Sequence, residues 1–379
     1  MPIVAVVALG AGAGETGLLQ VAATLPFVIL AFPIGLLVDR TSRARLMAGA
    51  EGVRAVSLLL ILGLALGGQL SLGWLALLGF LGACGTAVYS VAAPSLIPAL
   101  VPPGGLAAAN ARIELARTAA FTGGPALGGI LVGSVGGSAA FGLAAGASLA
   151  AALLLVAIEE PGRTAPPARQ IWREVSEGAA FVWRHALLRP IFATQIVFNA
   201  SFFIVQAVFV PYAVAHLGLS PSGIGLTLAG FGGAMVVGSL LAPVLIERLP
   251  FGVVIGCGPV SATLAAVVLA LTVLVPSPAL SAVAWFLFGV GPILWTISTT
   301  TLRQAVTPPA LLGRVTAISI VTWGARPIGA GIGAYVGTHY SEGACLVVAA
   351  FGFFVQMAMV LASPLVRLRE RPPMVDDLP

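Results

Sequence analysis

Three ionisable side chains lie inside long apolar segments of this chain, where a charge is costly and therefore a candidate for function. Glu114 and Arg117 are one helical turn apart, so a carboxyl there has a counter-charge within reach. Arg326 lies in the middle of another apolar segment, directly before Pro327. A carboxyl whose surroundings change can bind and release a proton. Glu114 is therefore a candidate for reversible protonation, with Arg117 or Arg326 as its counter-charge.

A second pair, Glu51 and Arg54, has the same spacing and competes for this role. It lies nearer to the end of its apolar segment, where membership of a terminal charge cluster is the alternative. No His, Asp or Glu residues cluster at the spacing of a catalytic or metal site, and the three cysteines are far apart. We therefore expect no enzyme, no metal and no other cofactor.

A polar stripe lies on one further apolar segment. Gln195, Asn199 and Gln206 fall within about 40° of one another at 100° per residue, so they share one helix face. Such a face suits a water-filled cavity. Hydrogen bonding between packed helices is the alternative for each of these residues.

The segments that carry these residues are long enough to cross a bilayer. Of the 379 residues, 59% are hydrophobic and 8% are charged, which is too apolar for one soluble core. A hydrocarbon layer about 30 Å thick needs roughly 20 helical residues, twice the length of a barrel strand. Eleven runs have this length: 17–38, 46–67, 72–97, 107–133, 137–158, 190–213, 223–246, 250–275, 279–302, 314–337 and 343–366.

The basic residues lie on one side of these predicted spans. All 18 are arginines, and they follow alternate spans, as Arg40, Arg43 and Arg45 do, whereas loops such as 67–73 and 275–279 contain none. The positive-inside rule then places both termini in the cytoplasm. It also explains the net charge of +5 without a nucleic acid partner.

The two halves of the sequence match each other at an offset of roughly 207 residues. Tyr89 corresponds to Trp295. Asp39 corresponds to Glu247, and an arginine directly follows each of these two acids. Residues 1–9 hold the place of a first helix but span only about 14 Å at 1.5 Å per residue. We expect an incomplete first helix, through a late start, a truncation or a protein that works without it.

The expected organisation has four parts. They are an N-terminal bundle over residues 1–158, a cytoplasmic linker with a short amphipathic helix over 159–188, a C-terminal bundle over 189–366 and a cytoplasmic tail over 367–379.

The loop after the first long run contains a charge cluster. Gly35, Asp39, Arg40 and Arg43 lie at a predicted membrane face, where a carboxylate and arginines can lock two bundles through salt bridges and helix-end dipoles. A simple positive-inside anchor is the alternative. The spacing resembles the signature G-x-L-x-D-R-x-G-R-[RK] of the major facilitator superfamily, with Ser42 in place of a glycine. The resemblance implies a gating role.

Another glycine-rich motif includes a proline. Gly124, Pro125, Gly128 and Gly129 predict a bend and a close helix contact. The motif resembles G-P-x-x-G-G of antiporters in that superfamily, where it marks exporters more often than importers. A pure packing role is the alternative.

Further stretches are similar to the branch that includes enterobactin exporters and macrolide efflux proteins, in particular 89–110 and 308–319. The resemblance implies an all-α integral membrane fold of two pseudosymmetric six-helix bundles. In the superfamily, helices 1, 4, 7 and 10 line the cavity, so Tyr89 and Trp295 become expected aromatic walls beside the polar stripe.

We expect a monomeric, proton-coupled exporter of a small amphipathic compound, such as a drug, macrolide or siderophore, in the bacterial inner membrane. Its partners are the cargo, protons and the lipid bilayer. An importer or facilitator of the same fold is the alternative, as is a truncated protein that does not transport.

Overall fold

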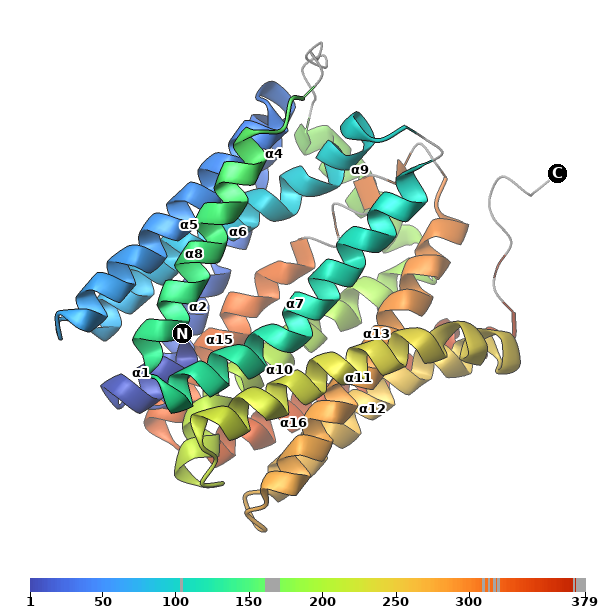
Figure 1. The fold of residues 1–379 in the computed structure, drawn as a ribbon. Coiled ribbons are helices and arrows are strands. Elements are labelled where there is room, and N and C mark those ends of the chain that lie inside the picture. The colour runs from blue at the N-terminus through green and yellow to red at the C-terminus, as the bar shows by residue number, and fades with distance from the viewer. Residues whose placement is uncertain are drawn as a thin grey trace.

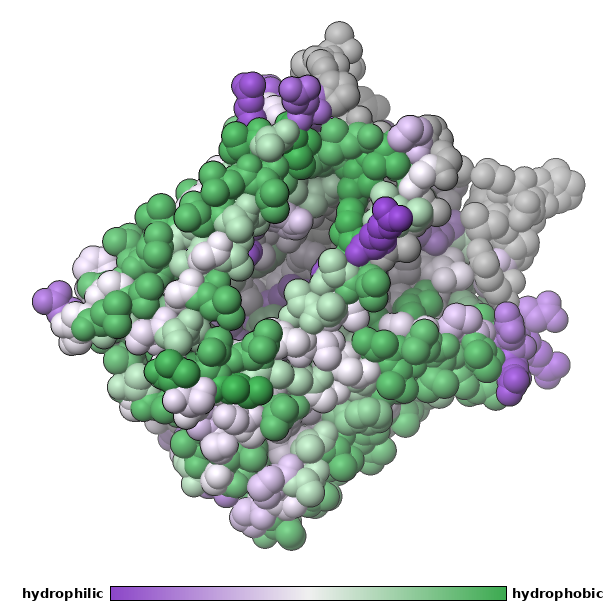
Figure 2. All heavy atoms as spheres, in the orientation of Figure 1, coloured by the Kyte–Doolittle hydropathy of each residue, from purple (hydrophilic) through white to green (hydrophobic). Residues whose placement is uncertain are grey.

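The computed structural model is helical throughout the part of the chain that it describes (Figure 1). Eight of the described helices are long and apolar enough to cross a membrane. Apolar side chains cover the sides of the long helices, as lipid contact requires (Figure 2). The structure describes residues 1–102, 105–160, 171–308, 311–312, 314–315, 318, 321–370 and 372.

The N-terminal half begins with a short helix. This helix, α1, has eight residues and spans about 12 Å. We predicted a short first helix over residues 1–9, and α1 lies within that range. The helices of this half are α1 Pro2–Leu9, α2 Ala13–Thr24, α3 Pro26–Ile29, α4 Ala31–Arg40, α5 Arg43–Leu66, α6 Leu72–Leu100, α7 Leu106–Ser134 and α8 Gly137–Val156.

The C-terminal half follows a helix, α9, in the predicted linker. Its elements are α9 Ile171–Arg184, α10 Leu188–Ala215, α11 Pro221–Arg248, α12 Phe251–Leu271, α13 Pro278–Val306, η2 Thr322–Gly324, α15 Ala325–His339, α16 Glu342–Leu361 and η3 Pro364–Arg367.

The first long run is not the single helix that we predicted over residues 17–38. It is divided into α2, α3 and α4, with breaks at Leu25 and Leu30. The cause is proline, because neither Pro26 nor Pro33 has an N–H group to continue the helical hydrogen bonding. The prediction over 314–337 was also too regular, since the one-turn 3₁₀ segment η2 precedes α15.

Serine residues begin the helices at one end of the molecule. We call this the Arg-poor end, because its loops, such as 67–73 and 275–279, contain no arginine, and we call the opposite end the Arg-rich end. The side chains of Ser71, Ser220, Ser277 and Ser341 each accept a hydrogen bond from the backbone N–H three residues later. These caps satisfy N–H groups that have no partner within the helix. They fix where α6, α11, α13 and α16 begin.

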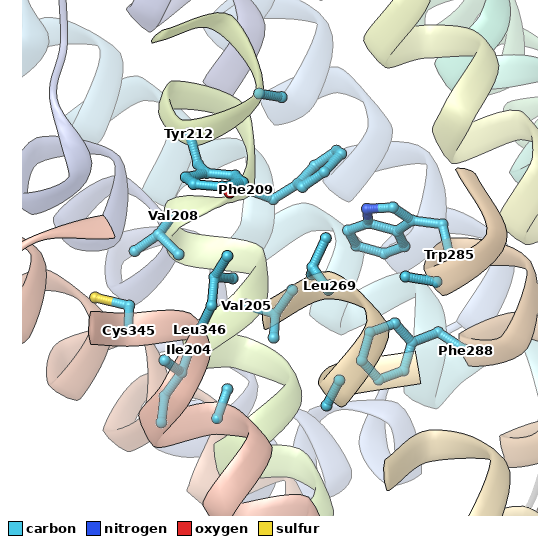
Figure 3. Close-up of a cluster of buried hydrophobic side chains, with 14 of the residues drawn as sticks. Ile204, Val205, Val208, Phe209, Tyr212, Leu269, Trp285, Phe288, Cys345 and Leu346 are labelled. Atoms are coloured by element: carbon cyan, nitrogen blue, oxygen red, sulfur yellow. The ribbon is translucent and has the colours of Figure 1, made fainter. Parts of the chain in front are cut away.

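The C-terminal half has an aromatic core. Phe209 and Trp285 meet edge to face with ring centroids 4.7 Å apart, and Phe288 lies 5.2 Å from Phe353 (Figure 3). The Tyr212 hydroxyl shares a hydrogen bond of 2.8 Å with Thr272, which satisfies a buried polar group. Such rings bury large apolar areas and add specific pair energies. This core joins α10, α12, α13 and α16.

The N-terminal half has a core of smaller side chains. Its two buried clusters consist mainly of Ala, Val, Leu and Ile, with Phe141 as the buried aromatic residue among them. α5 packs on both α6 and α8. Close packing of small residues, rather than aromatic rings, holds this half together.

The two halves meet at the Arg-poor end. α2 packs on α15 and α10, and α7 packs on α11. The Thr16 hydroxyl of α2 donates to the Ala207 carbonyl of α10 at 2.7 Å, so a hydrogen bond crosses between the halves. In Figure 1, α7 and α11 lie together at one end and diverge toward the Arg-rich end. The contact between the halves is therefore hinged at one side of the membrane.

Candidate functional site

A half-buried arginine joins two helices of the C-terminal half near the junction with the N-terminal half. Nε of Arg326 on α15 donates to Oδ1 of Asn199 on α10 at 3.1 Å. The guanidinium carbon lies 4.3 Å from the ring centroid of Trp323 and 5.4 Å from that of Phe203. Arginine stacks well on aromatic faces, so these contacts hold its charged plane in one position. We call Arg326, Asn199, Trp323 and Phe203 the arginine site.

Local backbone features bring this arginine to α10. The chain leaves η2 and enters α15 directly before Arg326. Two helical turns farther on, Gly333 lies against α10, where an added Cβ would be 2.9 Å from Ala207 Cβ and 3.2 Å from the Ile204 carbonyl oxygen. Gly329 is likewise pressed against the Ala200 backbone. Only glycine permits this approach, which places the arginine beside the polar stripe.

The arginine site has a charge that the described residues do not neutralise. Within the described ranges, none of the ion pairs involves Arg326. The site also adjoins the N-terminal half, because Trp323 meets Phe27 of α3 edge to face at 6.3 Å. A cation within the membrane-spanning part of a protein is expensive and is a candidate for function. The arrangement offers hydrogen-bond donors flanked by aromatic faces.

The polar stripe contributes one residue to this site. Asn199 is buried and uses both ends of its amide, since Nδ2 donates to the Gln195 carbonyl at 2.9 Å while Oδ1 accepts from Arg326. Gln195 and Gln206 are half-buried on the same helix. Sequence reasoning found both Asn199 and Arg326 but did not pair them. No sequence signal links positions 127 residues apart on different helices.

The two aromatic residues related by the repeat have different surroundings. Tyr89 on α6 is 40% exposed, as a cavity wall residue requires. Trp295 on α13 is 9% exposed and belongs to a packed apolar cluster. Its Cβ faces Gly258 of α12, where an added Cβ would lie only 2.5 Å away. The structure therefore separates the two residues that we expected to form matching walls.

Glu114 and Arg117 pair with each other on α7. The two hydrogen bonds between them are 2.7 and 3.0 Å long. The Glu114 side chain is 59% exposed and the Arg117 side chain 73% exposed. Exposed pairs of this kind contribute about 0 to 1 kcal/mol. Arg326 is in contact with neither of them among the contacts described for the arginine site.

The charge cluster after α4 is held by a residue that the sequence did not single out. Glu160 accepts hydrogen bonds from the Ser42 hydroxyl at 2.9 Å and the Ala44 N–H at 3.3 Å, and its carboxylate lies 3.5 Å from Arg43. Arg40 is exposed at the end of α4. The side chains at the expected gating positions Gly35 and Asp39 lie outside the described residues. The loop is thus fastened to the start of the linker within its own half.

This fastening makes a prediction about pH. Burial raises the pKa of Glu160, but the hydrogen bonds from Ser42, Ala44 and Arg43 and the Arg43 charge outweigh it, so the pKa is below its ordinary value. A lowered carboxyl pKa stabilises the fold above the ordinary value, and the gain is lost as the pH falls through the lowered value. We expect Glu160→Gln to cost about 1 kcal/mol at pH 7 and less at about pH 3, because the pH has then fallen toward the lowered pKa of Glu160.

Thermal unfolding of the purified protein in detergent at both pH values measures this difference. Glu159→Gln is the matched control, because Glu159 is the exposed neighbouring carboxylate. Equal destabilisation by the two substitutions would contradict the role given to Glu160.

The glycine–proline motif lies at the contact between the halves. A Cβ added to Gly129 would lie 2.6 Å from the Pro221 carbonyl oxygen and 2.7 Å from Gly225 Cα of α11. By contrast, a Cβ at Gly124 or Gly128 would meet nothing within 4 Å. Pro125 lies inside α7, and its carbonyl oxygen faces Gly225. One glycine of the motif therefore makes the contact.

Within the described ranges, no three His, Cys, Asp or Glu side chains are grouped to hold a metal ion.

Sequence comparison gives relatives among membrane transporters. The sequence model of the Major Facilitator Superfamily matches residues 1–334. The multidrug efflux pump Tap of Mycobacterium tuberculosis (strain ATCC 25618 / H37Rv) is 29% identical over 271 residues, which are 68% of this chain and 64% of the pump. The match thus spans less than two thirds of that pump's length. The uncharacterized MFS-type transporter y4rN of Sinorhizobium fredii is 30% identical over 351 residues, 85% of this chain and 80% of the relative.

Structural comparison agrees with the fold. The nucleoside transporter NupG superposes with a TM-score of 0.70 at 13% identity, covering 95% of this chain and 92% of that one. A bacterial homologue of the iron transporter ferroportin in the inward-facing state gives 0.70 at 16% identity, with 94% and 93% covered. These likenesses confirm the expected all-α fold of two six-helix bundles. Together with the sequence match, they establish that this chain belongs to the Major Facilitator Superfamily of membrane transporters.

Proposed function

We propose that this transporter exports a small amphipathic compound in exchange for protons by alternating access between its two halves. The arginine site is the observation that carries the proposal. It presents a half-buried guanidinium, with no carboxylate partner among the described residues, beside Trp323 and Phe203. A cargo with acceptor oxygens and an apolar body satisfies both the donors and the rings. Gln195, Gln206 and Tyr89 are the further candidate contacts for that cargo.

The motion that we propose follows from where the halves touch. Gly129 and Gly225 hold α7 against α11 at the Arg-poor end, while the same helices diverge toward the Arg-rich end (Figure 1). Closing the Arg-rich end requires opening the other. The cluster with Gly35, Asp39, Arg40 and Arg43 is the proposed gate at the closing end. By the positive-inside rule this end faces the cytoplasm, and both termini with it.

The efflux direction draws support from the sequence relatives. The Mycobacterium pump is named for multidrug efflux and shares 29% identity with this chain. The motif Gly124, Pro125, Gly128 and Gly129, typical of antiporters, favours the same direction. We propose a monomer in the bacterial inner membrane, because each chain contains both halves that alternating access needs.

Transport of radiolabelled erythromycin in inside-out membrane vesicles tests the function. Erythromycin is a suitable probe because it combines acceptor oxygens, a basic amine and an apolar ring. An interior more acidic by one pH unit drives at most about tenfold accumulation when one proton is exchanged per cargo molecule. We expect accumulation that an uncoupler abolishes. Accumulation driven only by a more acidic exterior would indicate proton symport, the mode of an importer, and no transport under either gradient would refute the proposal.

A further inference from the structure

Another charge pair in the N-terminal half has a buried carboxylate, while its arginine side chain is 36% exposed. Glu51 on α5 is 3% exposed, and its Oε2 lies 3.2 Å from Nη2 of Arg54 one turn along the helix. Nε of Arg54 donates to the Ser148 hydroxyl on α8 at 2.9 Å. Ser148 is fully buried. The carboxylate, guanidinium and hydroxyl thus form one chain across α5 and α8.

α6 packs closely against α5 beside this pair, and neither α6 nor α8 adds a charged side chain. Two glycines of α6 face α5. A Cβ added to Gly85 would lie 2.5 Å from the Ala50 carbonyl oxygen, and one added to Gly82 would lie 3.7 Å from Arg54 Cγ. The only titratable residues of α6 are Cys84 and Tyr89, and α8 has none. Arg54 is therefore the only formal counter-charge that α5, α6 and α8 place beside Glu51.

A cavity of about 470 Å³ lies beside the pair. Arg54, Ser57, Thr86 and Ser148 contribute its polar wall. A space of this size with several hydroxyl groups holds water. Of the two residues of the pair, Arg54 lines this space.

Burial separates this pair from the one on α7. Glu51 has a side chain that is 4% exposed, whereas that of Glu114 is 59% exposed. Moreover, Oε2 of Glu51 makes no hydrogen bond of good geometry, although it lies near Arg54. A charge change in such a place is weakly screened, so it acts strongly on nearby groups. A charge change at the exposed pair is screened by water.

We propose that Glu51 binds the exchanged proton, with Arg54 as its fixed counter-charge and Ser148 as the group that holds Arg54 in place. The proposal rests on the export function above. When the Glu51 carboxylate gains one proton, Arg54 keeps its charge and the pair changes from neutral to +1. With the acceptor oxygens of the cargo toward Arg326 and its basic amine toward the Glu51 pair, the added positive charge disfavours the cargo, and by reciprocity bound cargo expels the proton. Mutual exclusion of proton and cargo is what an antiporter requires.

The test compares two kinds of erythromycin transport in proteoliposomes of purified protein. Accumulation driven by a pH gradient needs proton coupling, whereas exchange of labelled for unlabelled cargo at equal pH does not. We expect Glu51→Gln to remove the pH-driven accumulation, which is at most about tenfold for one pH unit, while cargo exchange continues. Glu114→Gln is the matched control, because it removes the same charge from a pair of identical spacing. We expect it to retain both activities.

A binding measurement adds a readout that folding defects do not imitate. Adding erythromycin to the weakly buffered wild-type protein in detergent releases protons, and Glu51→Gln abolishes this release while binding remains. Glu51→Asp restores it. If Glu51→Gln keeps normal pH-driven accumulation or normal proton release, the Glu51 assignment is wrong. If the wild-type protein neither exchanges nor accumulates cargo, the export function itself fails.

Discussion

Replacing Gly129 with leucine is expected to abolish transport by keeping the two halves apart at the Arg-poor end. A Cβ at this position already lies 2.6 Å from the Pro221 carbonyl oxygen and 2.7 Å from Gly225 Cα, so a larger side chain cannot fit while α7 touches α11. Overpacking of this kind costs about 1–3 kcal/mol. If this cost falls on one of two conformations in equilibrium, it changes the ratio of their populations by about 5- to 150-fold.

The neighbouring residue supplies the control for this prediction. A Cβ at Gly128 meets nothing within 4 Å, so Gly128→Leu adds the same side chain to the same helix without the clash. Distances between spin labels on α7 and α11 should increase at the Arg-poor end in Gly129→Leu and stay unchanged in Gly128→Leu. Normal transport by Gly129→Leu would show that the halves do not need this contact.

Loss of the Arg326 side chain is expected to weaken erythromycin binding by about tenfold or more, because charged hydrogen bonds contribute about 1.5–3 kcal/mol. Arg326→Ala removes the group that donates to the Asn199 amide oxygen. It also removes the cation beside Trp323 and Phe203. Arg326→Lys keeps the charge but loses the planar group that stacks on the rings. It should therefore bind with intermediate affinity.

A double-mutant cycle with Asn199→Ala separates a shared site from two independent defects. Because the two side chains are in direct contact, their effects on binding should be non-additive by about 0.5–3 kcal/mol. Equilibrium binding of labelled erythromycin to the four purified proteins gives this coupling. Arg112→Ala, at an exposed arginine of α7, controls for removal of a positive charge. Additive losses would place Arg326 outside the cargo site.

The fold followed closely from the sequence because it depends on strong, local signals. Run length and arginine placement predicted the membrane class, and α5, α8 and α10 begin and end within a few residues of the predicted spans. The exceptions lie at prolines. The run over 17–38 breaks at Pro26, because whether a proline bends or interrupts a membrane helix depends on what its neighbours can satisfy.

The site was less predictable because it depends on contacts between distant residues. Helical spacing correctly paired Glu114 with Arg117, which are on one helix. The same rule does not show that Glu51 is sealed by α6, or that Asn199 reaches Arg326 on another helix. The repeat aligns Tyr89 with Trp295 in sequence. It did not indicate that Trp295 turns toward Gly258 and into the core.

The unequal cores of the two halves have a consequence for how this transporter can evolve. The C-terminal half depends on interlocking rings such as Phe209, Trp285 and Phe288, and removing one such buried ring costs about 3–5 kcal/mol (Figure 3). The N-terminal half, packed from alanine and small aliphatic residues, tolerates exchanges of smaller cost. Core substitutions should therefore accumulate mainly in the N-terminal half, while changes of cargo specificity in the C-terminal half are confined to positions outside its aromatic core.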